Sequence, residues 1–348
     1  MITVQTLKQI EVSFRQFGYE AEDVFNALFS CYMDIFEIQP TEQLIVLYEK
    51  GKIIVNIVFQ DTILKEIIIY KVKTDKQGDN LPVIYQYFLA KRFRDITGKF
   101  FTPKDLAAQM ASLLPIKKNA IIMDPTCGGG TFLKEIAKQW ADTPCTLIGN
   151  DIDEMLVCLT ALTLHIRKKK HHHIELICNN LYAPKADLRQ WFGKVDYILA
   201  NPPFSLPIDS FSSDSKLFQL GYRNSDALFI DLAFDLLKTD GRLVCLLPHS
   251  IVSNKEFEKL RKIVELDWHL SAVLILPEGV FQPSAQTTTR ADMLILDKKS
   301  IHNPKKKTIF SNIASLGVPL SAKQPQSDKN DLQTILKSKA VAEILGIL

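Results

Sequence analysis

The stretch DPTCGGGTFL, residues 124–133, follows a short apolar run at residues 120–123 and leads into an amphipathic segment that ends near Trp140. An apolar run, an acid, three glycines and then apolar residues at helical spacing predict a strand, a tight turn and a helix. Glycines adopt positive φ and let a ligand approach the backbone, and the N–H groups of the new helix favour an anionic group. The stretch therefore indicates either a site for a nucleotide-like cofactor in an α/β sheet or an ordinary glycine-rich turn.

The segments around this stretch alternate between apolar runs typical of buried strands and patterns typical of helices. Strands are predicted at seven segments, namely residues 120–123, 146–149, 174–178, 195–200, 242–247, 272–276 and 292–296. Helices are predicted between most of them, for example at residues 154–167, 226–237 and 253–266. Because this alternation is typical of a doubly wound sheet, we expect an α/β, Rossmann-like domain of about seven strands over residues 96–300.

The two ends of the chain predict less regular parts. Residues 1–95 predict a smaller accessory domain of mixed structure, with helices near residues 7–17, 24–36 and 81–96. β-branched and aromatic residues on both sides of Glu49-Lys50-Gly51-Lys52 predict a hairpin between Leu44 and Phe59, and residues 63–72 fit a strand or a helix. Residues 301–348 predict a basic linker, with Lys305, Lys306 and Lys307, followed by one amphipathic helix.

Composition limits the class of protein. The chain has 348 residues, of which 47% are hydrophobic, and a formal net charge of +3. These values predict a globular protein with a large core, and the charge alone gives no argument for nucleic acid. Six cysteines without CxxC spacing favour buried thiols in a reducing cytoplasm over disulfides or a zinc site. Without a leader or an apolar run long enough to span a membrane, we expect a soluble cytoplasmic protein.

The run from Arg167 to His173 contains three lysines and three histidines, between a predicted helix and a predicted strand. Adjacent histidines cannot all converge on one ion, and no carboxylate or cysteine lies at ligand spacing. The run is therefore better interpreted as a solvated basic loop, favoured by the dipole at the helix C-terminus. We predict no metal site.

Two polar positions accompany the glycine-rich stretch. Asp151 ends the second predicted strand, 23 residues after Gly128. An acid at about this offset reaches ribose hydroxyls in doubly wound folds. Alternatively, Asp151 caps the next helix, a role that Asp153 can fill by itself. Upstream, Thr102 stands before a proline and can cap a helix at residues 104–114.

The predicted strand at residues 195–200 runs directly into Asn201-Pro202-Pro203-Phe204. Two prolines fix an extended turn and remove two N–H donors, so the carbonyl of Pro202 can point outward. An amide oxygen, a carbonyl oxygen and an aromatic face then lie at the carboxyl edge of the sheet, where ligands bind in such folds. Simple termination of the strand by proline is the alternative.

These groups together indicate methyl transfer to an amine. A primary amine on an aromatic ring is a poor nucleophile because its lone pair is delocalised. Acceptors from Asn201 and Pro202 on its two N–H bonds favour a pyramidal nitrogen, and stacking on Phe204 holds the ring. S-adenosylmethionine offers a methyl group on a positively charged sulfur, and the protein needs only to orient it. Attack by the nitrogen breaks the bond between the methyl group and sulfur. The nitrogen becomes acidic only after the methyl group arrives, so solvent or an acceptor can take its proton and no separate general base is required.

The combined motifs resemble the DNA methyltransferases that modify the N6 amine of adenine, and more closely the modification subunits of type I restriction-modification systems. The resemblance rests on Gly98–Pro103, Asp124–Leu133, Asp151 and Asn201–Phe204, in that order. It covers roughly residues 81–299 and includes Asn224-Ser225-Asp226 with Phe229, Leu247-Pro248-His249 and Leu276–Phe281. It implies methyl transfer from S-adenosylmethionine to the N6 amine of an adenine flipped out of DNA.

The resemblance also implies roles for individual residues. Asn201, Pro202, Pro203 and Phe204 would form the catalytic site. The cofactor would be bound by Phe101, Thr102 and Pro103 at its methionine end, by the loop with Asp124, Thr126, Gly128 and Gly130, by Asp151 at the ribose, and by Ile152 and Asn179 at the adenine.

The chain departs from the family pattern at three points. The loop contains Gly128-Gly129-Gly130-Thr131 instead of glycine-serine-glycine-glycine, Asn179 replaces a common acid, and both ends are shorter than usual in the family. Residues 205–225 are too few for a target-recognition domain. Because base contacts specify a DNA site, we expect a separate specificity subunit as partner, and a restriction subunit is a further expected partner.

Other functions are compatible with the same motifs. NPPF-type sequences also occur in methyltransferases of RNA bases, and a tyrosine version serves protein glutamine. A catalytically idle module that docks DNA or a partner is a third possibility, favoured by the short ends and opposed by the intact Asn201–Phe204. A nicotinamide oxidoreductase explains neither the two prolines nor Phe204.

Overall fold

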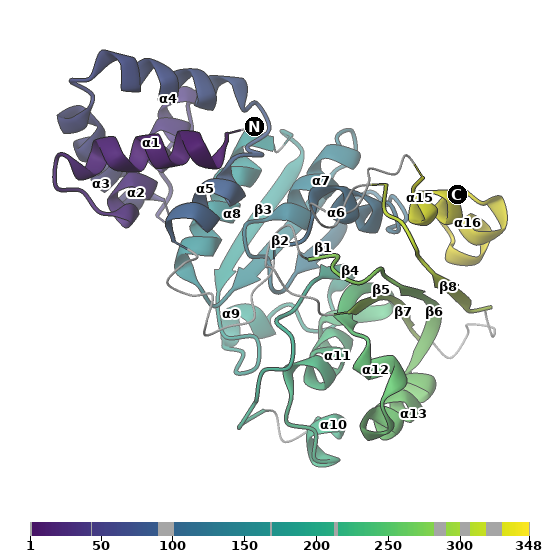
Figure 1. Cartoon of the computed structure of the whole chain (residues 1–348). Coiled ribbons are helices and arrows are strands. Elements are labelled where there is room, and N and C mark those ends of the chain that lie inside the picture. The colour runs from purple at the N-terminus through teal and green to yellow at the C-terminus, as the bar shows by residue number, and fades with distance from the viewer. Residues whose placement is uncertain are drawn as a thin grey trace.

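The computed structural model describes most of the chain, and Figure 1 shows its arrangement. The described residues are 2–42, 44–89, 101–167, 169–211, 215–281, 290–299, 307–317 and 329–347. Within them, no helix combines the length and the apolar character that crossing a membrane requires.

The N-terminal part consists of helices within the described residues. These are α1 (Val4–Arg15), α2 (Ala21–Ile35), α3 (Ile45–Val58), α4 (Thr62–Thr74) and α5 (Leu81–Phe88). Their apolar side chains form one core with Leu156, Leu159 and Leu162, which belong to α8 (Glu154–Arg167). The helices pack beside α8, at the β3 edge of the sheet (Figure 1). The second half of the helix predicted at residues 81–96 lies outside the described residues.

The predicted hairpin between Leu44 and Phe59 is wrong, because α3 runs through the whole segment. Gly51, Ile54 and Val58 are buried at helical spacing. A Cβ at Gly51 would lie 2.0 Å from the carbonyl oxygen of Asn26 in α2. The glycine therefore allows two helices to touch and does not mark a turn. The ambiguous run at residues 63–72 belongs to α4, with buried residues four apart.

The sheet is an eight-stranded α/β sheet with the order β3-β2-β1-β4-β5-β7-β6-β8. Its strands are β1 (Ala120–Asp124), β2 (Cys145–Asp151), β3 (His172–Cys178), β4 (Val195–Ala200), β5 (Leu237–Pro248), β6 (Trp268–Ile275), β7 (Ala291–Lys298) and β8 (Ile309–Asn312). β7 is antiparallel to β5 and β6, and the other pairs are parallel. The order reverses between β1 and β4, which is where ligands bind in doubly wound folds. The predicted fold class is confirmed.

Helices cover both faces of the sheet, so central strands such as β4 are buried on both sides. The covering helices include α8 together with α6 (Lys104–Ala111), α7 (Thr131–Gln139), α11 (Ser225–Leu236) and α13 (Glu258–Asp267). Three short helices are α9 (Ala186–Arg189), α10 (Lys216–Gln219) and α12 (Ser250–Ser253), and α10 packs on α11. Successive strand residues face opposite cores: Ile122 belongs to the core that contains residues of α6 and α7, and Met123 belongs to the core that contains residues of α11.

The C-terminal prediction is wrong in two respects. β8 lies where a basic linker was expected and pairs with β6, with Phe310 opposite Val273. Two short helices, α15 (Asp331–Leu336) and α16 (Lys339–Leu345), replace the single helix, because Ser338 is extended between them. The four residues of β8 are alternately half-buried and exposed, so its formation as a strand depends on pairing with β6.

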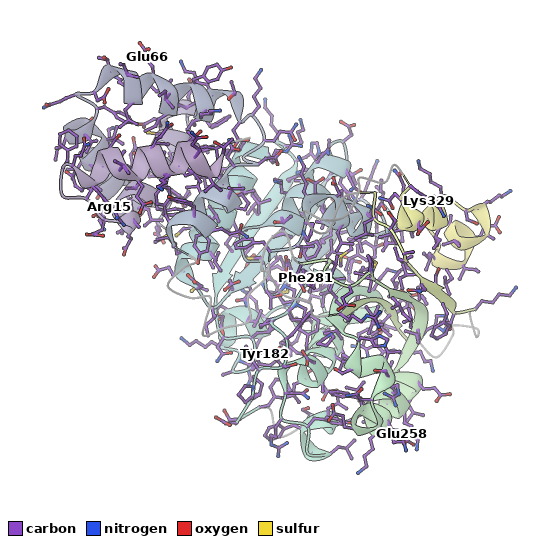
Figure 2. All side chains as sticks on the ribbon, viewed as in Figure 1. Arg15, Glu66, Tyr182, Glu258, Phe281 and Lys329 are labelled. Atoms are coloured by element: carbon purple, nitrogen blue, oxygen red, sulfur yellow. The ribbon has the colours of Figure 1, made fainter. Side chains whose placement is uncertain are left out.

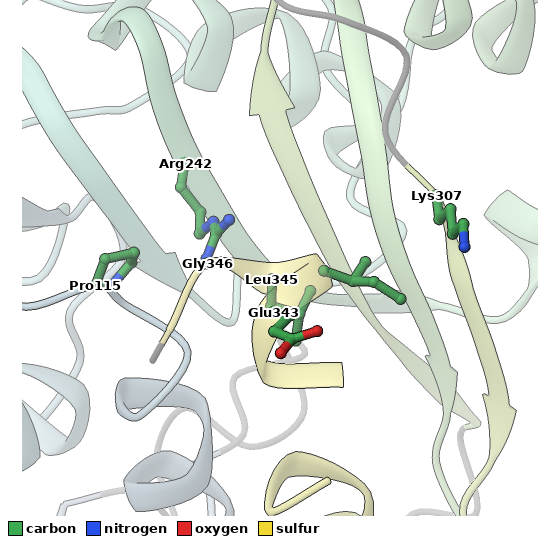
Figure 3. A pocket seen from close by; sticks show the side chains of 7 residues that line it. Pro115, Arg242, Lys307, Glu343, Leu345 and Gly346 are labelled. Carbon is green, nitrogen blue, oxygen red and sulfur yellow. The ribbon is translucent and has the colours of Figure 1, made fainter. Parts of the chain in front are cut away.

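The C-terminal segment also borders a cavity of about 540 Å³ (Figure 3). Arg242 and Pro115 line it together with Lys307 and residues 343–346. Arg242 pairs with Tyr197 in the sheet, and Pro115 precedes β1. The cavity therefore lies toward the amino ends of the central strands, away from the predicted site.

The histidine run is not a solvated loop throughout. His172 begins β3, is buried, and contacts the carbonyl oxygen of Trp140 through Nε2 at 3.1 Å. Its Nδ1 accepts a hydrogen bond from the Lys169 N–H at 3.3 Å. Burial lowers the pKa of His172, which favours this neutral form. His171 and His173 on either side are exposed, as the sequence predicted.

Replacement of Gly51 by alanine is expected to destabilise the protein by about 1–3 kcal/mol, because the new methyl group would overlap the backbone of α2. The intrinsic helix preference alone predicts the opposite sign, a gain of about 1 kcal/mol. Asn56→Ala, on the exposed side of the same helix, is the matched control and should be neutral or slightly stabilising. Urea unfolding of both variants measures the difference. A Gly51→Ala protein as stable as the control would contradict the helix contact.

Candidate active site

The glycine-rich loop between β1 and α7 is held by β2 and α8. Cys127 donates its N–H to the carbonyl oxygen of Asn150 at 2.7 Å. Gly128 donates its N–H to Oδ2 of Asp151 at 3.0 Å, and its carbonyl oxygen accepts from the hydroxyl of Thr160 at 2.6 Å. These three bonds fix the loop to β2 and to α8.

The glycines in this loop have different functions. Gly128 has φ +50°, and an added Cβ would meet nothing within 4 Å, so this part of the loop faces open space. Gly130 has φ +77°, and its Cβ would lie 3.0 Å from Thr160. A Cβ added at Gly129 would lie 2.9 Å from the ring of Phe101. Gly128 therefore leaves room for a ligand, whereas the other two allow close packing.

Two buried acids lie beside this loop. Oδ1 of Asp124 accepts the N–H of Thr126 at 3.1 Å, and burial raises the pKa of this carboxyl well above its usual range. Asp151 accepts from Gly128 through Oδ2 and from the N–H of Asp153 through Oδ1, at 3.0 Å each. Asp153 accepts the N–H of Met155 at 3.0 Å and so caps α8. Asp153 therefore caps α8, and Asp151 is not needed for that role.

The ends of β2 and β3 carry the next two predicted residues. The side chain of Ile152 is 61% exposed, which is unusual for a large apolar residue after a buried strand. Asn179 is buried and donates Nδ2 to Oδ1 of Asp187 at 2.6 Å. Its amide is therefore engaged with α9, and a carboxylate lies next to it. Cys178, the one exposed residue among the six free cysteines, departs from the predicted buried thiols.

Phe101, Thr102 and Pro103 lie on the same side as the glycine-rich loop. Phe101 meets Tyr85 edge-on, with ring centroids 5.9 Å apart. The predicted cap by Thr102 is wrong: α6 begins after Pro103 and has no side-chain cap. The Thr102 hydroxyl instead accepts a hydrogen bond from Nδ2 of Asn201 at 3.2 Å. Residues 98–100 of the predicted motif lie outside the described residues.

This bond joins two predicted motifs that are 99 residues apart. Asn201 follows the last residue of β4, next to the loop of β1. Phe204 is buried and contacts Phe281 with centroids 5.9 Å apart (Phe281 is labelled in Figure 2). The structure therefore brings the two motifs and the glycine-rich loop to one edge of the sheet.

Sequence reasoning missed two residues that support this edge. Tyr85 of α5 donates its hydroxyl to Asp153 at 3.3 Å, so the N-terminal helices contact the loop that follows β2. Nothing in the helical pattern of residues 81–88 distinguishes Tyr85 from a core aromatic. Thr160 is fully buried within an apolar helix. A hydroxyl in such a helix is a signal that could have identified it.

Comparison with solved structures identifies the class of fold. A protein of Listeria monocytogenes described as a class I S-adenosylmethionine-dependent methyltransferase superimposes with TM-score 0.61 and 18% identity, over 99% of this chain and 98% of that one. The methyltransferase subunit of a type I restriction-modification system from Streptococcus thermophilus superimposes with TM-score 0.61 and 16% identity, over 98% of this chain and 92% of that one. The fold is that of the class I methyltransferases.

The family model described as N-6 DNA Methylase matches residues 76–342, and the chain belongs to this family. A relative named type I restriction enzyme MjaVII methylase subunit, from Methanocaldococcus jannaschii, is 27% identical over 257 residues, 68% of this chain and 42% of the relative. A relative from Methanothermococcus thermolithotrophicus named "Probable tRNA (guanine(10)-N2)-dimethyltransferase" is 34% identical over 140 residues, 40% of this chain and 76% of the relative. The chain spans less than half the length of the type I relative.

Thr160→Val is expected to destabilise the protein by about 1–3 kcal/mol, because the carbonyl oxygen of Gly128 loses its donor while the shape of the side chain is kept. Thr163→Val is a matched control on the same helix. Among the described residues, the buried hydroxyl of Thr163 has no hydrogen-bond partner, so its removal should be neutral or stabilising. Urea unfolding compares the two variants. Equal effects would show that the bond to Gly128 does not hold the loop.

Proposed function

We propose that this chain transfers a methyl group from S-adenosylmethionine to the exocyclic N6 amine of an adenine flipped out of DNA, as the modification subunit of a restriction-modification system. The observation that carries the proposal is the hydrogen bond from Asn201 to Thr102, beside the glycine-rich loop. It joins the groups expected to activate an amine to the groups expected to hold the methyl donor. Membership of the N-6 DNA Methylase family supports the same reaction.

The residues of the loop fit the proposed cofactor. The open space at Gly128 leaves room for its methionine part, with Phe101, Thr102 and Pro103 alongside. The buried hydroxyl of Thr126 has no hydrogen-bond partner among the described residues and can bind a polar group of the ligand.

The ribose and adenine of the cofactor would lie at the end of β2. A carboxylate oxygen can accept more than one hydrogen bond, so Asp151 can bind a ribose hydroxyl while it accepts the N–H groups of Gly128 and Asp153. Ile152 is exposed where it can pack on the adenine. Asn179 lies behind this position, with its amide fixed by Asp187.

The chain's own residues would orient and activate the target amine. The bond from Nδ2 to Thr102 fixes the plane of the Asn201 amide, so its Oδ1 can accept one N–H of the amine. The carbonyl oxygen of Pro202 would accept the second N–H. Phe204, held by Phe281, would stack on the flipped base. The bound cofactor supplies an electrophilic methyl group on a sulfonium.

Sequence recognition would come from a partner. Between Ser205 and Asn224 the described residues form only one helix, α10, of four residues. Since base contacts specify a DNA site, a separate specificity subunit would supply them, and a restriction subunit would complete the system. The name of the M. jannaschii relative, a subunit of a type I restriction enzyme, supports such an assembly.

An RNA base is the second candidate substrate. It is favoured by the similarity over 140 residues to the relative whose printed name refers to tRNA. The activation of an exocyclic amine by Asn201 and Pro202 would be the same on either nucleic acid. The choice therefore depends on which polymer is labelled.

Asn201→Ala is expected to lower the transfer of labelled methyl groups to DNA by about 100-fold or more, because one acceptor for the reacting amine is lost. Binding of S-adenosylmethionine, measured by calorimetry, should persist. The assay uses the full chain, alone and with its cognate specificity subunit, on DNA and on tRNA. Transfer of labelled methyl groups to tRNA only would favour an RNA base as the substrate. Absence of cofactor binding to the wild-type chain would favour an idle docking module.

The affinity for S-adenosylmethionine is expected to rise with pH, owing to Asp124. The raised pKa of Asp124 means that the free protein keeps this proton above the usual range for aspartate. A bound cation lowers the pKa of Asp124, so binding of the cofactor releases the proton of this carboxyl. The affinity therefore rises with pH until the carboxyl is already deprotonated in the free protein. Calorimetry in buffers of different ionisation enthalpy measures the released proton. Binding of adenosine, which is uncharged, should release no proton. If Asp124→Asn releases as much proton as the wild-type chain when S-adenosylmethionine binds, Asp124 is not the source of the proton.

A further inference from the structure

The start of α11 contacts the turn that follows Phe204. The hydroxyl of Ser225 donates to the carbonyl oxygen of Pro203 at 2.8 Å and accepts the N–H of Leu206 at 3.0 Å. The carboxylate of Asp226 accepts the N–H of Ser205 at 3.0 and 3.2 Å and its hydroxyl at 3.2 Å. Ser225 and Asp226 are both buried, and the Tyr182 hydroxyl binds the carbonyl oxygen of Ser225 at 3.1 Å (Tyr182 is labelled in Figure 2).

These contacts distinguish the two consecutive proline carbonyls. Neither Pro202 nor Pro203 has an N–H, so a carbonyl oxygen is the only polar backbone group that each of them offers. Ser225 occupies the second carbonyl. Within the described part of the chain, the Pro202 carbonyl accepts no hydrogen bond. It is therefore the carbonyl left to bind a substrate amine.

Asp226 holds a strained residue. Ser205 has φ +55°, in the left-handed region that a residue with a Cβ adopts at a cost. The bonds from its N–H and hydroxyl to Asp226 offset that cost, and they also compensate the burial of the carboxylate. Strain that is maintained by surrounding bonds is found more often at functional sites than elsewhere.

The helix itself does not require these two side chains. Asn224 is the N-cap of α11, and its side chain accepts the N–H of Ala227 at 3.0 Å. Asn224 therefore performs the ordinary capping role, whereas Ser225 and Asp226 face the turn. The three adjacent residues have separable functions, which provides an internal control.

We propose that Ser225 and Asp226 are positioning residues that hold Asn201–Phe204 in its reactive shape: Ser225 by binding the Pro203 carbonyl, Asp226 by holding Ser205 in the left-handed conformation. The inference rests on the proposed function. Neither residue contacts the amine. Both act through the turn, by directing the Pro202 carbonyl and the Phe204 ring.

The experiment compares Ser225→Ala and Asp226→Ala with the control Asn224→Ala. We expect the first two to lower kcat for methyl transfer by about tenfold to 100-fold, because misplaced reacting groups slow the chemical step. The affinity for S-adenosylmethionine should stay at the wild-type value. Asn224→Ala should keep the wild-type kcat. Equal losses in all three variants, or a loss in cofactor affinity alone, would overturn the proposal.

A rescue experiment separates positioning from stability. Glycine adopts a left-handed φ without strain and keeps the N–H, so Ser205→Gly alone should stay active. Ser205→Gly should also restore part of the kcat lost in Asp226→Ala. Failure of this rescue would contradict the role assigned to Asp226. If Asp226→Ala does not fold, Asp226→Leu, which fills a similar volume and has no acceptor for the Ser205 N–H, is used in its place with the same expectations.

Hydrogen exchange makes the test independent of the reaction. The amides of residues 204–206 should exchange faster in Ser225→Ala and Asp226→Ala than in the wild-type chain and in Asn224→Ala. This readout holds even if the wild-type chain labels no nucleic acid, an outcome that would refute the proposed function alone. Unchanged exchange in both variants would refute the positioning role alone.

Discussion

The hydrogen bond from the Gly128 N–H to the buried carboxylate of Asp151 is the contact on which the candidate site depends. It connects the loop after β1 to the end of β2, and the same carboxylate binds the N–H of Asp153 at the start of α8. Two crossovers of the sheet thus meet at one side chain. A glycine is required because φ is positive and because any Cβ would project into the space left for a ligand.

The N-terminal helices take part in the same arrangement. Leu156, Leu159 and Leu162 of α8 belong to the core of the helical region, while Thr160 of the same helix holds the glycine-rich loop. Tyr85 reaches both Phe101 and the helix cap. Because one helix packs against both regions, a displacement of the N-terminal helices would also move the loop.

Sequence reasoning succeeded where local chemistry decides the structure. Three glycines after an apolar run, and two prolines after another, are compatible with few local structures, and both motifs lie at the predicted edge of the sheet. Sequence reasoning failed where contact with a residue far away in the sequence decides the structure. The sequence predicts a turn at Gly51 because it does not show the neighbouring helix, and it predicts a cap at Thr102 although the partner of Thr102 is Asn201. β8 likewise becomes a strand only beside β6.

The two loops at this edge use the same physical device. Gly128 and Ser205 both have positive φ, and each donates its N–H to a buried aspartate from a neighbouring element, Asp151 or Asp226. Under the proposed function, Asp124, which holds the same loop through the N–H of Thr126, would lose its proton when the cofactor binds and place negative charge close to it. Under the proposed function this charge favours the sulfonium of S-adenosylmethionine over the uncharged thioether that remains after transfer. The groups that fix the loops would then also favour exchange of the used cofactor for a fresh one.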